Sequence, residues 1–150
     1  MKDYLKLFRI KQYIKNFLIF MPCFFAKNIF KLNNNEQIKL LFGFIIFCLT
    51  SSIVYIINDI IDLEEDKNNK IKKDRPLASG KISLKNAYIS IILLTLLNIF
   101  INILLNNYKI ACLIITYFIL NIFYSKVLKN IPIIDIYCLS LFYIIRIFYG

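Results

Sequence analysis

Acidic and amide side chains gather at the end of a long apolar stretch, and their types are those that bind divalent cations. The segment 51–80 is SSIVYIINDIIDLEEDKNNKIKKDRPLASG. If its first half is helical, each residue turns the chain by about 100°, and the polar groups fall within a stripe about 100° wide. Isoleucine, valine and leucine cover most of the opposite side. We therefore predict a helix end with one apolar face and one face of oxygen ligands. Its ligands are Asn58, Asp59, Asp62 and Asp66.

This stripe is unfavourable without a partner. Carboxylates near a helix C-terminus meet the negative end of the helix dipole, and they repel one another across one turn. A divalent cation would remove both costs. Oxygen ligands without neighbouring His or Cys favour Mg²⁺, which takes one or two carboxylates and completes its shell with water and substrate phosphates. The basic segment 67–75 follows directly, so the region predicts a Mg²⁺-bound diphosphate. A solvated helix end with a charged loop is the alternative interpretation.

The composition indicates a membrane protein. The 150 residues are 59% hydrophobic and carry a formal net charge of +10. A soluble domain this apolar would expose large apolar patches. The basic residues concentrate in 2–15, 67–85 and 126–131, which disfavours a nucleic-acid partner. Basic loops mark the inner side of membrane proteins. We therefore predict a multi-pass protein of the cytoplasmic membrane, with its N-terminus and acidic segment on the cytoplasmic side.

The predicted fold class is an all-α integral membrane protein, a multi-span helical bundle with about five transmembrane helices in this chain. The expected spans are about 17–30, 38–61, 84–105, 108–125 and 132–150, preceded by an interfacial amphipathic helix in 1–16. The four cysteines lie inside apolar runs and are expected to be reduced packing residues. Because the last span ends without a polar tail, we expect 1–150 to be the N-terminal portion of one longer membrane domain.

A second set of polar residues lies in and before the last predicted span. Asp135 and Arg146 return to nearly the same helix face but are about 16 Å apart along the axis, so they cannot pair with each other. Charges inside a span are costly, which predicts a functional role or a partner on another helix. Lys129 could reach a phosphate at the membrane surface, although ordinary inside-loop charge also explains it.

Four sequence blocks resemble those of a known family. NDIIDLEED at 58–66 matches the NDxxDxxxD motif of the UbiA superfamily of intramembrane prenyltransferases. QYIKN at 12–16 resembles the QWxKN block of its decaprenyl-phosphate phosphoribosyltransferase branch. KKDRPLASG at 72–80 and YSKVLKNIPIIDIYCLSLFYIIRIFYG at 124–150 resemble two further blocks of that branch. The resemblance implies an all-helical bundle of about nine spans, since helices satisfy their own backbone groups in a bilayer.

The resemblance also implies roles for individual residues. Asn58, Asp59, Asp62 and Asp66 would hold Mg²⁺ on the donor diphosphate. Lys15, Lys72, Arg75, Lys129 and Arg146 would contact phosphate groups. Asn16 and Tyr124 would line the cavity. The catalytic residues would be Asp59, Asp62 and Asp135, with Asp135 orienting a basic group or the acceptor. The chain departs from the branch at Tyr13, where the branch has Trp, and at Asn69-Lys70, where it has His-Pro.

The implied reaction is transfer of a phosphoribosyl group from phosphoribosyl diphosphate to a polyprenyl phosphate. The partners would be these two substrates and the lipid bilayer. Prenyl transfer from a polyprenyl diphosphate to an aromatic acceptor of the quinone or haem type is the alternative, because it uses the same acidic motif. A truncated, inactive membrane protein that binds anionic lipid through its basic loops is a third possibility. The family has a second acidic motif that 1–150 lacks, so this portion alone is expected to be inactive.

Overall fold

The structure is a computed structural model that describes residues 2–26, 32–128 and 131–150. All regular secondary structure in these ranges is helical, which confirms the predicted all-α class. The elements are α1 (Lys2–Leu7), the 3₁₀ helix η1 (Ile10–Phe20), α2 (Met21–Phe25), α3 (Asn34–Ile61), α4 (Leu63–Asn68), the 3₁₀ helix η2 (Lys72–Asp74), α5 (Leu84–Leu105), α6 (Tyr108–Lys126) and α7 (Pro132–Tyr149).

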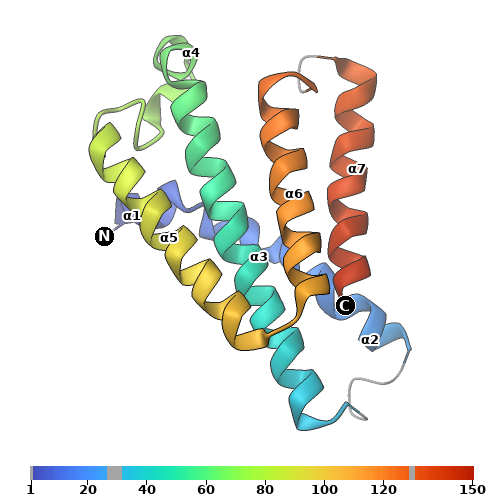
Figure 1. The fold of residues 1–150 in the computed structure, drawn as a ribbon. Helices are drawn as coiled ribbons and strands as arrows, with labels where there is room; N and C mark the ends of the chain where they lie inside the picture. The colour runs from blue at the N-terminus through green and yellow to red at the C-terminus, as the bar shows by residue number, and fades with distance from the viewer. Residues whose placement is uncertain (1, 27–31, 129–130) are drawn as a thin grey trace.

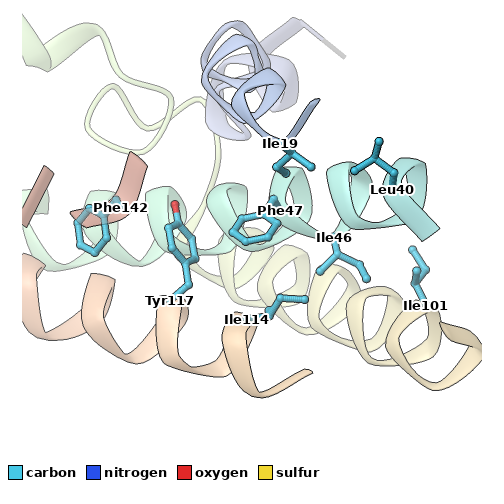
Figure 2. Packing of buried hydrophobic residues seen from close by; sticks show 8 residues of the cluster. All are labelled: Ile19, Leu40, Ile46, Phe47, Ile101, Ile114, Tyr117 and Phe142. Atoms are coloured by element: carbon cyan, nitrogen blue, oxygen red, sulfur yellow. The ribbon is translucent and has the colours of Figure 1, made fainter. Parts of the chain in front are cut away.

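The longest helix, α3, forms the axis of the bundle. In Figure 1, α5 lies along one side of α3, α6 and α7 lie on the other, and the N-terminal segment crosses the bundle to end beside the C-terminus. Apolar side chains from η1, α5, α6 and α7 meet around α3 (Figure 2). Phe47 of α3 makes edge-on ring contacts with Tyr117 and Tyr149, with ring centroids 5.3 and 5.4 Å apart. Such contacts add to simple burial and fix the helices relative to one another.

Local signals explain where α3 and α5 begin and end. Asn33 and Glu36 form a capping box, in which the side chain of each accepts a hydrogen bond from the backbone N–H of the other. This cap starts α3 four residues before the predicted Ile38, whereas its predicted end at Ile61 is confirmed. Ser83 caps α5, and Asn106 ends it in the left-handed conformation at φ 45°. The predicted bounds of α5, α6 and α7 are confirmed to within one residue.

The prediction of a first long helix over 17–30 is wrong. The chain there continues η1 to Phe20 and then forms the five-residue α2, with Pro22 in its first turn. Residues 27–31 lie outside the described ranges. The predicted interfacial helix in 1–16 is also interrupted, because α1 ends at Leu7 and Arg9 adopts a left-handed conformation. Asn16 and Ile19 of η1 are buried, so this segment packs into the bundle.

Two of the described helices, α3 and α5, are long and apolar enough to cross a membrane. The stretch 110–126 of α6 is a shorter apolar helix. Most apolar side chains of α5 point outward, as a hydrocarbon environment allows. Asn98 of α5 donates to Thr50 Oγ1 of α3 at 2.8 Å, which joins the two helices by a polar contact of the kind found between membrane helices. The number of spans stays a prediction.

Candidate functional site

The acidic segment lies at one end of the bundle, where α3 gives way to α4. Asp62 separates the two helices with φ −89° and ψ 9°, so the predicted stripe does not continue on one unbroken helix. The backbone still turns in a helical sense, since the Asp66 N–H donates to Asp62 O at 2.8 Å. Asp59 and Asp66 therefore remain on the same side and are both buried, with 2% and 1% of their surfaces exposed.

The two buried carboxylates are joined by cations from outside their helices. Nη1 of Arg75 lies 2.6 Å from Asp66 Oδ2 and 3.3 Å from Asp59 Oδ1. Arg9 donates from Nη2 to the same Asp59 Oδ1. Lys72 Nζ lies 3.8 Å from Asp66 Oδ1. The sequence predicted that Lys72 and Arg75 contact substrate phosphate, whereas the structure places both beside the carboxylates. We call these five residues the ion network.

Two of the predicted metal ligands carry oxygens without a hydrogen-bond partner. Asn58 Oδ1 and Asp66 Oδ1 are both buried and accept no hydrogen bond within the part of the chain that the structure describes, although Lys72 Nζ lies 3.8 Å from Asp66 Oδ1. An unsatisfied buried acceptor costs about 1–3 kcal/mol. A bound cation would remove this cost, so the donor set fits Mg²⁺, which needs only one or two carboxylates from the protein. Among the described residues, no three acidic, His or Cys side chains gather as a metal-binding group.

A cavity of about 290 Å³ opens beside the ion network, between α3, η1, α6 and α7. Its cationic lining residues are Arg9, Lys15 and Arg146, and none of the described lining residues is acidic. Asn58 also lines the wall, so a predicted metal ligand faces the cavity directly. Positive charge on a concave, partly apolar wall favours an anion. The cavity is therefore suited to a ligand that carries phosphate.

Arg146 is the most buried cation of this cavity, with 5% of its surface exposed. Its guanidinium donates to Asn16 Oδ1 at 2.8 Å, to the Tyr117 hydroxyl at 2.7 Å and to Phe142 O at 2.7 Å. All three partners are neutral, and the ion pairs found among the described residues do not include Arg146. A buried charge without a counter-ion is costly, which indicates that an anion completes this environment.

The remaining residues predicted for the site do not all lie on the cavity wall. Tyr124, which was expected to line the substrate cavity, lies on the wall of this cavity. Asp135 is not on the described cavity wall, and its Oδ1 instead accepts a hydrogen bond from the Tyr124 hydroxyl. Asn16 is 1% exposed and lies behind Arg146, so it supports the wall instead of lining it. Lys129 lies outside the described residues.

The N-terminal segment reaches the cavity because polar contacts attach it to α3. Ser52 Oγ donates to Phe8 O at 2.8 Å, which leaves the Tyr13 hydroxyl to donate to Ser52 Oγ at 2.7 Å. Burial raises the pKa of Tyr13, which keeps its phenol protonated and able to donate. Asn16 Nδ2 donates to Cys48 Sγ at 3.3 Å. These contacts fix η1 across α3 and thereby place Arg9 and Lys15 at the cavity.

Sequence reasoning did not identify Arg9 as a site residue. It was counted only among the basic residues of the N-terminal segment. Among the described residues, Arg9 belongs both to the ion network and to the cavity wall. Its position three residues before the QYIKN block was the available signal, because that block was already expected at the site.

Comparisons with known proteins show the family to which the chain is similar. Residues 19–150 match the family model described as the UbiA prenyltransferase family. The chain is 31% identical over 147 residues to a decaprenyl-phosphate phosphoribosyltransferase of Corynebacterium glutamicum, covering 97% of this chain and 44% of that protein. It is 35% identical over 113 residues to a digeranylgeranylglyceryl phosphate synthase of Sulfurisphaera tokodaii, covering 75% and 40%. An uncharacterized protein of Sinorhizobium fredii is 34% identical over 149 residues, covering 99% and 28%. The chain thus spans less than half the length of these relatives.

Proposed function

Since this chain belongs to the UbiA prenyltransferase family, a membrane-integral family, we propose that it forms the donor-binding part of a Mg²⁺-dependent transferase that acts on a diphosphate. The observation that carries the proposal is the buried Arg146, which faces a cationic cavity and whose hydrogen-bond partners among the described residues are all neutral. A diphosphate would supply the missing negative charge. The buried oxygens of Asn58 and Asp66 that accept no hydrogen bond from the described residues support a cation beside it.

The proposed reaction is transfer of a phosphoribosyl group from phosphoribosyl diphosphate to a polyprenyl phosphate. A relative with the name decaprenyl-phosphate phosphoribosyltransferase covers 97% of this chain, which supports this donor and acceptor. The sequence blocks at 12–16 and 72–80 support the same branch. In this chemistry the donor diphosphate leaves from carbon, and bound Mg²⁺ would neutralise the charge that develops on the leaving group.

The protein's own residues would perform four tasks. Lys15 and Arg146 would bind the phosphate groups from the cavity wall. Asp59 and Asp66 would hold the cation at the end of α3, with Asp62 at the junction beside them. Asp135 would act through Tyr124, because its carboxylate fixes the direction of the phenol at the cavity. The apolar bundle around the cavity would exclude water that could otherwise capture the reacting carbon.

Prenyl transfer remains a second candidate for this site. The relative with the name digeranylgeranylglyceryl phosphate synthase favours it, because that name describes a prenyl product on a phosphate-bearing acceptor. An aromatic acceptor, expected from the sequence as the alternative, has no such support. An inactive protein that binds anionic lipid through surface loops is disfavoured, because Arg146, which has no counter-ion among the described residues, is buried at the cavity and not exposed on a loop.

We further propose that the protein lies in the cytoplasmic membrane with the acidic end of α3 toward the cytoplasm. The end of α6 and the start of α7 lie at the same end of the bundle as α4 (Figure 1), so the basic segments around 72 and 126 share one side. Basic residues prefer the cytoplasmic side. Soluble diphosphates and Mg²⁺ are available there.

The test is a transfer assay on membranes that contain the protein with its whole reading frame. Labelled phosphoribosyl diphosphate and a polyprenyl phosphate are supplied with and without Mg²⁺. We expect Mg²⁺-dependent label in the lipid phase, and its loss in Asp62→Asn. Glu64→Gln is the matched control, because Glu64 is a nearby acid in α4 and its side chain is 81% exposed. Activity lost equally in both variants, or label only with a prenyl diphosphate donor, would contradict the phosphoribosyl proposal.

A further inference from the structure

Arg9 connects two features that otherwise share no described residue, the ion network and the cavity. Its Nη2 donates to Asp59 Oδ1, and its side chain also lines the cavity beside Lys15 and Arg146. The side chain is 27% exposed, so part of the guanidinium remains accessible. An arginine carries five N–H donors in a rigid plane and can contact a carboxylate and a phosphate at the same time. A lysine ammonium lacks this planar geometry.

The surrounding structure holds Arg9 in this position. Its guanidinium carbon lies 4.7 Å from the centre of the Tyr55 ring, and Tyr55 also lines the cavity. Its backbone is left-handed, with φ 51° and ψ 46°, between α1 and η1. Glycine or asparagine would adopt this conformation at lower cost. A bulky cation at such a position therefore points to a role for the side chain and not for the turn.

We propose that Arg9 is a positioning residue for Asp59 and a contact for the donor diphosphate, so that a single guanidinium couples the metal-binding carboxylate to the anion. This inference rests on the proposed function, because it assumes that the cavity anion is a diphosphate. Arg75 holds the same Asp59 oxygen at 3.3 Å but is not on the described cavity wall. Arg9 is therefore the arginine of the pair that can respond to a ligand in the cavity.

Two variants separate this role from a structural one. Arg9→Lys keeps a positive charge near Asp59 but removes the planar donor set. Arg9→Asn removes the cation and suits the left-handed backbone, so the turn should persist. Lys11→Gln is the matched control, because it removes one exposed positive charge from the same segment and has no contact with Asp59 among the described residues. All proteins carry the whole reading frame and are purified in detergent.

The measurement is equilibrium binding of inorganic diphosphate, by calorimetry, with and without Mg²⁺. We expect the Kd for diphosphate to rise about tenfold to a hundredfold in both Arg9 variants, as for loss of a hydrogen bond to a charged group. We also expect the tightening of diphosphate binding by Mg²⁺ to shrink in these variants, whereas Lys11→Gln retains both values. A second arm uses a short-chain polyprenyl monophosphate, because the lipid substrate also carries phosphate.

Three other results of the binding measurement would each contradict a different part of the proposal. Diphosphate affinity and Mg²⁺ coupling equal to those of Lys11→Gln would overturn the role of Arg9 while leaving the proposed function intact. A loss confined to the lipid monophosphate would overturn the assignment to the donor and place Arg9 at the acceptor. Failure of the unsubstituted protein to bind diphosphate would overturn the proposed function and, with it, this inference.

Discussion

Two ion pairs of almost equal length allow burial to be tested as the source of their strength. Nη1 of Arg75 lies 2.6 Å from Asp66 Oδ2, and Lys67 Nζ lies 2.7 Å from Glu64 Oε1. The Asp66 side chain is 1% exposed and that of Glu64 is 81% exposed. Breaking a buried pair costs about 3–5 kcal/mol. Because the Arg75 side chain is 28% exposed and partly screened, we expect a coupling free energy of about 2 kcal/mol.

The assay is a pair of double-mutant cycles. One combines Arg75→Gln with Asp66→Asn, and the control combines Lys67→Gln with Glu64→Gln. The free energy of unfolding is measured for each protein in detergent micelles with a chelator present, so that no divalent cation competes for Asp66. The exposed pair should couple by about 0.5 kcal/mol or less. Equal coupling free energies for the two pairs would refute the argument that burial makes the ion network strong.

Three further perturbations test other parts of the structure. Arg146→Met should raise the Kd for diphosphate about tenfold or more, because a charged hydrogen-bond donor is lost. Circular dichroism should show that the variant is folded. Unchanged diphosphate binding would contradict the assignment of the cavity to an anion. Gly43→Ala places a Cβ against the Tyr149 ring and should lower the free energy of unfolding by about 1–3 kcal/mol. In a Tyr149→Ala background the same substitution should cost less, because the clashing ring is gone. Asn98→Ala removes the bond to Thr50 and should cost about 1 kcal/mol in the same unfolding assay; no loss would show that this interhelical bond contributes nothing.

Local patterns in the sequence were sufficient for most of the helices. The bounds of α5, α6 and α7 follow from apolar length and from the breaks at Asn106 and Pro132, which act over a few neighbouring residues. The acidic motif and its position at the end of α3 follow in the same way. The first predicted helix failed because Asn16 and Tyr13 form hydrogen bonds to residues of α3 and α7, which draws 10–25 into the bundle in short helices.

The partners of Arg9 and Arg146 depend on how distant helices pack. Arg9 and Asp59 are 50 positions apart, and Arg146 and Asn16 are 130 positions apart. No local periodicity encodes such pairs, because they depend on how η1 crosses α3 and approaches α7. Local sequence therefore specifies which chemical groups are present and which helix ends carry them. The packing of the helices decided that Arg75 contacts the carboxylates, that Arg9 joins them to the cavity, and that Arg146 lacks a counter-ion among the residues described.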